Sequence, residues 1–218
     1  MSASNAVYIE VGARRCFACS LEWPGLSRSG KSEEAALVAL SEYVRRYALV
    51  ADRAGVDFPL TEDQEWSVVE RVPTRSGGAD FGAPTAMLEQ DGRDLSRAEV
   101  TRTAALMTAS WEYFDDVAAV APESLRKGPR GGGRDREAIV DHVAAAEQMF
   151  GRQVGLSLPV PKPGDRKVMM ANRELVLAWC RSGTAGGQER AGWPAPFATR
   201  RLIWHVLDHA WEIEDRVQ

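Results

Sequence analysis

Apolar and polar positions alternate in short stretches up to about residue 75. Residues 7–11, 16–21 and 65–72 have the β-branched, alternating pattern of strands. Between the second and third stretches, residues 32–51 have helical spacing, and Ser32 is a natural N-cap before two glutamates. This order predicts a small β-β-α-β domain over residues 1–75.

Prolines and glycines then interrupt the pattern over residues 76–95, which predicts a linker that lies over the surface. Beyond it, the spacing predicts four amphipathic helices at residues 96–120, 134–154, 166–181 and 199–217. The first of them begins with a capping box of Ser96 and Glu99. We therefore predict an α+β protein in which an antiparallel four-helix bundle fills residues 96–218.

Composition narrows the class of protein. The chain has 218 residues, of which 44% are apolar, so a disordered chain is excluded. A net charge of −4 argues against nucleic acid as a partner, and no apolar run is long enough for a membrane span. Three cysteines do not make a disulfide framework, and no secretory signal is visible, so we expect a cytoplasmic protein.

The chain has only three histidines, and their spacing indicates a metal site. His205 and His209 are one helical turn apart, so both rings can reach one ion. His142 falls on the second predicted bundle helix, on a face that we expect to point inward with Ala138, Ile139, Ala145, Ala146 and Met149. Three neutral imidazoles suit Zn or Ni, with Fe, Cu or Mn as alternatives. The competing interpretation is a solvated HxxxH face and a core histidine.

Two segments carry a resemblance to a known family. The sequences REAIVDHVAAAEQMF and, far downstream, RRLIWHVLDHAWEIEDR resemble the DinB-like superfamily of metal-binding four-helix bundles. The resemblance covers about residues 96–218 and implies that His142, His205 and His209 bind a divalent metal. It also implies a small-molecule substrate, a homodimer, and a transferase or isomerase activity that uses a low-molecular-weight thiol such as mycothiol.

Two further features near these histidines are candidates for chemistry. Glu212 lies one turn beyond His209, where it can act as a catalytic base, a fourth ligand or an orienting carboxylate, or else only pair with Arg216. The basic segment 126–135 precedes the helix of His142, and its Arg130 and Arg134 are candidates for binding an anionic cofactor or substrate group. The alternative is a flexible basic loop.

The N-terminal segment is similar to HicB-like domains over about residues 5–72. The matching residues are Trp23-Pro24-Gly25, Ser29-Gly30 and Ser32-Glu33-Glu34-Ala35. This resemblance implies a small α/β fold and supports an alternative function for the chain. In that alternative the protein is a non-enzymatic binding or stress-response module, its metal is structural or vestigial, and the N-terminal domain recruits a partner.

Overall fold

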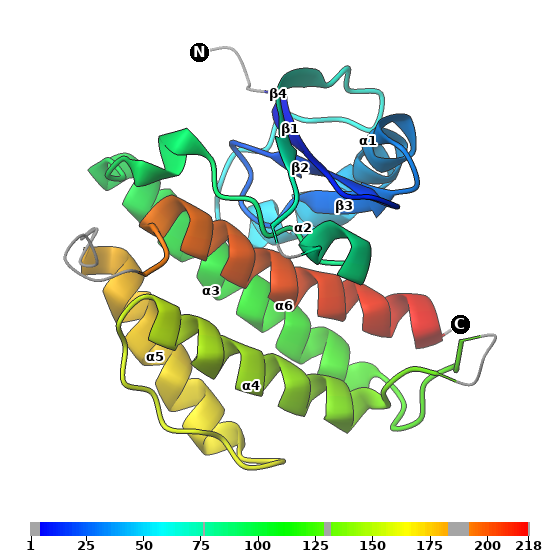
Figure 1. The fold of residues 1–218 in the computed structure, drawn as a ribbon. Coiled ribbons are helices and arrows are strands. Elements are labelled where there is room, and N and C mark those ends of the chain that lie inside the picture. The colour runs from blue at the N-terminus through cyan, green and yellow to red at the C-terminus, as the bar shows by residue number, and fades with distance from the viewer. Residues whose placement is uncertain (1–4, 76, 129–131, 183–191, 218) are drawn as a thin grey trace. The chain divides into compact units, whose positions relative to one another are not determined.

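The structure is a computed structural model that describes residues 5–75, 77–128, 132–182 and 192–217. Over these residues it contains one four-stranded mixed sheet and six α-helices, which confirms the α+β class (Figure 1). The chain divides into two compact units, Met1–Gly92 and Arg93–Gln218.

The sheet of the first unit has the strand order β3-β2-β1-β4. Strands β1 (Ala6–Val11), β2 (Cys16–Ser20) and β3 (Ser27–Gly30) form an antiparallel meander, and β4 (Ser67–Pro73) pairs in parallel with β1. The predicted β-β-α-β order is therefore wrong in omitting β3. This strand has no apolar alternation, and it is held by its pairing with β2.

The single helix predicted over residues 32–51 is also wrong, because two helices occupy this region. Helix α1 spans Glu33–Glu42 and α2 spans Val44–Arg53, with the break at Tyr43. Ser32 caps α1 as predicted, with its side chain accepting a bond from the Ala35 amide. Gly30 permits the close packing of β3 on α1, since a Cβ there would lie 2.3 Å from the Ala36 nitrogen.

The segment after β4, predicted as a linker, packs with the first unit as far as Gly92. It contains two short 3-10 helices, η1 (Gly78–Phe81) and η2 (Glu89–Gly92). Two carboxylates tie it to the sheet. Asp80 accepts bonds from the backbone amides of residues 13–15 in the β1–β2 turn, while the fully buried Glu10 accepts bonds from Thr74, Thr85 and Ala86.

Replacing Glu10 with alanine is expected to destabilise the first unit by about 3 kcal/mol, because several buried donors lose their acceptor at once. Urea unfolding measures this loss, and amide exchange should become faster at Thr85 and Ala86. The matched control is Glu70→Ala on β4, since the Glu70 side chain makes no hydrogen bond with the described residues. Equal losses in the two variants would show that Glu10 does not hold the segment.

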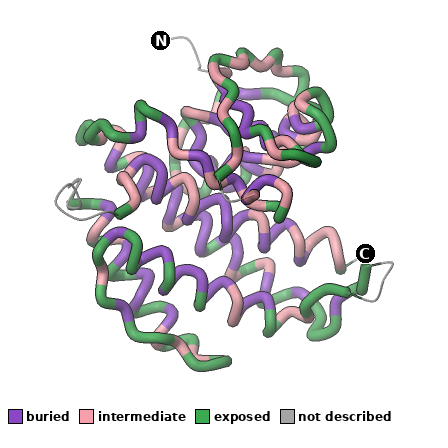
Figure 2. The backbone as a smooth tube through the Cα atoms, viewed as in Figure 1, coloured by how far each residue is buried: buried purple, intermediate pink, exposed green. Residues whose placement is uncertain are grey.

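The second unit consists of four helices that pack in pairs. Helix α3 (Arg97–Val120) contacts α5 (Arg166–Ser182) and α6 (Ala195–Val217), and α4 (Arg136–Gln153) contacts the same two helices. The predicted capping box at Ser96 and Glu99 is present. The helices bury their facing sides (Figure 2), with a core that includes Leu106, Phe114, Ile139, Leu202, Leu207 and Trp211. No helix in the described ranges is long and apolar enough to cross a membrane.

An ion network is buried among α3, α4 and α5. The Arg173 guanidinium donates to Glu147 at 3.0 Å and to Asp115 at 2.8 Å, and the side chains of Arg173 and Glu147 are only 4% and 3% exposed. Burial alone disfavours the cation, but the two carboxylates outweigh it and raise the pKa of Arg173. The network therefore joins three of the four helices through one buried cation.

Candidate metal centre

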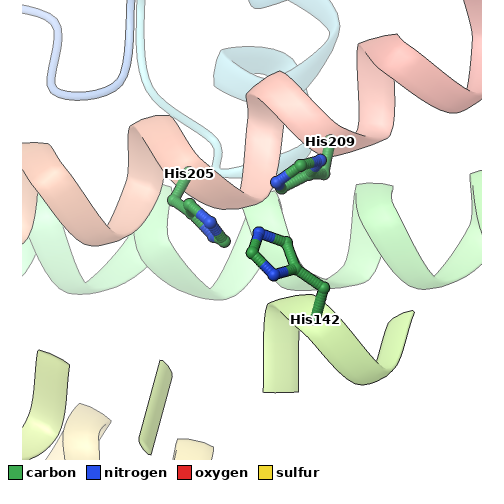
Figure 3. Close-up of side chains that lie close together, drawn as sticks. All are labelled: His142, His205 and His209. Atoms are coloured by element: carbon green, nitrogen blue, oxygen red, sulfur yellow. The ribbon is translucent and has the colours of Figure 1, made fainter. Parts of the chain in front are cut away.

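The three histidines form one cluster between α4 and α6. Their rings converge (Figure 3), with centroids 5.1 Å apart for His142 and His205, 4.8 Å for His142 and His209, and 4.6 Å for His205 and His209. One nitrogen from each ring lies within 4.8 Å of the others. The one-turn spacing on α6 places two of these nitrogens side by side, and α4 supplies the third.

The cluster is mostly shielded from solvent. His205 is 7% exposed and His209 is 9% exposed, while His142 is half-buried. The competing interpretation, in which α6 presents a solvated HxxxH face, is therefore wrong. The predicted inward face of α4 is only partly correct, because Ile139 and Ala146 are buried whereas the other three residues assigned to it, Ala138, Ala145 and Met149, are exposed. The buried side of α4 is centred closer to Ile139, and His142 lies at its edge.

Glu212 connects His209 to Arg216. One carboxylate oxygen is 2.7 Å from Nδ1 of His209, and the other accepts from Nη1 of Arg216, also at 2.7 Å. The bond through Nδ1 leaves Nε2 of His209 as the nitrogen available to the cluster. The two interpretations of Glu212, an orienting carboxylate and an ion-pair partner of Arg216, are thus both present in the geometry.

Burial and nearby positive charges keep the rings of His142 and His205 neutral. Burial is the main cause that lowers the pKa of His142, to about 4, and the charges of His209 and Arg134 lower it further. Burial likewise lowers the pKa of His205 well below its usual value, with His209 and Arg201 adding to the effect. Burial raises the pKa of Glu212, but its bonds to His209 and Arg216 outweigh burial and keep the pKa low. At neutral pH the site therefore has free imidazole lone pairs.

One polar atom of the cluster lacks a partner. Nδ1 of His205 is buried and makes no hydrogen bond with any described residue. A buried polar atom without a partner costs about 1–3 kcal/mol, so such atoms call for an explanation. Three imidazoles, one oriented by a carboxylate and one with an orphaned nitrogen, fit the donor set of a divalent transition metal.

The basic segment before α4 is tied to the end of α6. Arg126 donates to the Asp215 carbonyl and its own carbonyl accepts from Arg216, while Lys127 pairs with Asp135. These contacts use two of the four cations that the sequence offered for binding an anion. Arg130 lies outside the described residues. Arg134 is exposed and makes no hydrogen bond or ion pair with the residues described.

Aromatic side chains flank the cluster next to His205. They were not predicted from the sequence. The Phe150 ring packs edge-on against His205, with centroids 5.4 Å apart, and also contacts Trp193. The Arg201 guanidinium lies over the rings of Phe150 and Trp204, at 5.4 and 4.6 Å from their centroids. The sequence could have indicated that Arg201 lies near His205, because the two are one helical turn apart. It could not indicate the contact with Phe150, which depends on how α4 and α6 pack.

The cysteines lie apart from this centre along the chain. Cys16 and Cys19 lie on β2 without a disulfide bond, and residues three apart on a strand face opposite sides of the sheet. Cys180 is buried on α5. Burial is the main cause that raises the pKa of the Cys16 thiol, and it raises that of Cys180 to about 11. Neither property is that of an activated nucleophile.

Comparison of the chain with protein-family models, curated proteins and solved structures gives no match. The resemblances to the DinB-like superfamily and to HicB-like domains therefore stay predictions.

Proposed function

We propose that the second unit is a DinB-like antiparallel four-helix bundle that binds a divalent metal through His142, His205 and His209. The observation that carries the proposal is the convergence of one nitrogen from each of the three rings within 4.8 Å. The pairwise packing of the four helices supports the bundle. Zn and Ni are the ions that we expect first, because three neutral imidazoles suit them.

The chain's own residues have distinct roles in this proposal. His205 and His209 provide two nitrogens from one face of α6, and His142 provides the third from α4. Glu212 is a positioning residue, since its bond to Nδ1 fixes the ring of His209, and Arg216 in turn holds the carboxylate. The catalytic role predicted for Glu212 as a base is less favoured, because both of its oxygens are already bonded.

We propose further that the protein is a thiol-dependent transferase or isomerase of the mycothiol type. A divalent ion at this centre supplies Lewis acidity and lowers the pKa of a bound water or thiol. Three protein ligands leave room for such a molecule. The half-buried His142 offers the side from which a substrate can approach, while the aromatic side chains beside His205 exclude water from the opposite side.

Spectroscopy of the Co²⁺-loaded protein tests this function. Adding 2-mercaptoethanol should produce a thiolate-to-cobalt charge-transfer band in the parent protein and none in His205→Leu. A protein that binds Co²⁺ but gives no such band would contradict the thiol-dependent activity. The same band in His205→Leu would contradict the assignment of the ligands.

Replacing Glu212 with glutamine is expected to weaken metal binding by about 10–100-fold, because the His209 ring loses its oriented, charge-assisted partner. Competition with a chromophoric Zn²⁺ chelator measures the dissociation constant. The matched control is Glu214→Gln on the same helix, since Glu214 bonds to Tyr113. The control should retain the parent affinity, and an equal loss in both variants would exclude a positioning role for Glu212.

The burial of His205 and His209 favours a second candidate function. In it the metal only stabilises the helices, and the protein is a non-enzymatic binding or stress-response module whose HicB-like domain recruits a partner. A closed structural site would bind Co²⁺ tightly yet give no change on adding the thiol. The spectroscopic experiment therefore separates the two candidates.

A further inference from the structure

The charges around the three-histidine centre are unbalanced once a divalent ion is present. The imidazoles contribute no negative charge when they bind as neutral ligands. Among the described residues, Glu212 is the carboxylate bonded to the cluster, and its charge is already matched by Arg216 at 2.7 Å. A dication in this mostly buried site thus keeps its full charge, which is costly in a region of low dielectric constant.

Arginines increase this positive charge from two sides. Arg201 lies over the aromatic rings next to His205, one turn before it on α6. Arg134 lies two residues before α4, the helix of His142, and its charge acts on both His142 and His205. An anion that approaches the ion would be attracted by the ion and by both arginines.

Backbone packing connects the residue before Arg134 to the centre through a chain of contacts. A Cβ on the preceding residue, Gly133, would lie 2.8 Å from Nη2 of Arg216, so this backbone rests directly on the guanidinium that holds Glu212. Gly133 also has a φ of +120°, which an L side chain rarely adopts. A chain of contacts therefore runs from Gly133 through Arg216 and Glu212 to His209. The loop is held against Arg216, at the outer end of this chain of contacts, while the Arg134 side chain stays exposed.

We propose that Arg134 binds an oxyanion, a carboxylate or a phosphate group, of a substrate at the three-histidine centre. This inference rests on the proposed function, because it requires the ion to be present. Arg134 suits the role since a guanidinium matches both groups with a fork of two donors. It is also the described cation of segment 126–135 that has no hydrogen-bond or ion-pair partner among the described residues. The orphaned Nδ1 of His205 is the independent sign that the adjoining site takes a ligand.

The test uses the Co²⁺-loaded full chain and small probes. Acetate and inorganic phosphate are titrated separately, and their binding is followed through the visible absorption of the cobalt. Acetamide, which is neutral and similar in shape to acetate, is the probe control. At least one of the two anions should shift the spectrum with saturation, and acetamide at the same concentrations should not. The preferred anion distinguishes a carboxylate from a phosphate substrate.

Arg134→Gln should weaken the binding of that anion by about tenfold, the effect of losing one charge-assisted contact. The matched control is Arg152→Gln, an exposed arginine at the other end of the same helix, which should bind the anion within about twofold of the parent. Equal affinity in Arg134→Gln and the parent, or equal shifts with acetate and acetamide, would overturn the inference. Failure of the parent protein to bind Co²⁺ would instead overturn the proposed function.

Discussion

Replacing His205 with leucine is expected to abolish tight metal binding and at the same time to stabilise the metal-free protein. Loss of a direct ligand should raise the dissociation constant for Zn²⁺ by more than about 100-fold, beyond the loss that removal of an orienting partner causes. The metal-free protein should gain about 1 kcal/mol, because leucine removes the buried Nδ1 that has no hydrogen-bond partner among the described residues.

Chelator competition and urea unfolding of the metal-free protein measure these two effects separately. The two effects have opposite signs, which makes the result diagnostic. Replacing a residue that only packs in the core would lower the stability of the protein and leave its metal affinity unchanged. The matched comparison is Leu202→Ala on the same helix, which should destabilise the protein and leave the dissociation constant unchanged. Retention of parent affinity in His205→Leu would show that this ring is not a ligand.

Replacing Arg173 with methionine is expected to destabilise the second unit by about 3–5 kcal/mol, because Glu147 is left as an uncompensated charge in the core. Glu147 is only 2% exposed. Urea unfolding followed by circular dichroism measures the loss. A decrease below about 1 kcal/mol would contradict a structural role for the network.

Two further variants separate the network from the general effect of losing an arginine. Arg166→Met removes a surface arginine of the same helix, whose pairing with Glu137 at 3.5 Å should contribute less than about 1 kcal/mol. The double variant Glu147→Leu with Arg173→Met should recover much of the stability lost in Arg173→Met, because apolar side chains replace a buried pair well. No recovery would mean that Arg173 stabilises the core through its packing on Trp111 instead.

The second unit was the more predictable part of the chain, for a local reason. Helical periodicity and end signals operate within one or two turns, so the start of α3 at the Ser96–Glu99 capping box could be predicted from the sequence. In the first unit, β3 could not be predicted, since Ser27–Gly30 resembles a turn and is a strand only because β2 pairs with it. The break between α1 and α2 at Tyr43 could not be predicted either, because no proline or glycine marks it. In the structure the Arg28 guanidinium packs on the Tyr43 ring, a contact between residues far apart in the sequence.

The candidate site shows the same division between local and long-range information. The pairing of His205 with His209, and of Glu212 with Arg216, follows from spacing on one helix. The convergence of His142 on them could be predicted only in part, because the buried side of α4 differs from the predicted face and His142 lies at its edge. The partnership of Arg173 with Glu147 could not be predicted, because residues on separate helices carry no shared sequence signal. For the same reason the sequence analysis missed Phe150 beside His205.

The most direct test of the metal centre is the metal content of the protein itself. The full chain, purified without a metal-affinity tag, is stripped with a chelator, replenished separately with Zn²⁺ and Ni²⁺, desalted and measured by elemental analysis. The three converging histidines predict about one ion per chain, and a content near zero in His205→Leu. A content below about 0.2 ion per chain in the replenished parent protein would be too little for a specific site. That result would contradict the proposed three-histidine metal centre.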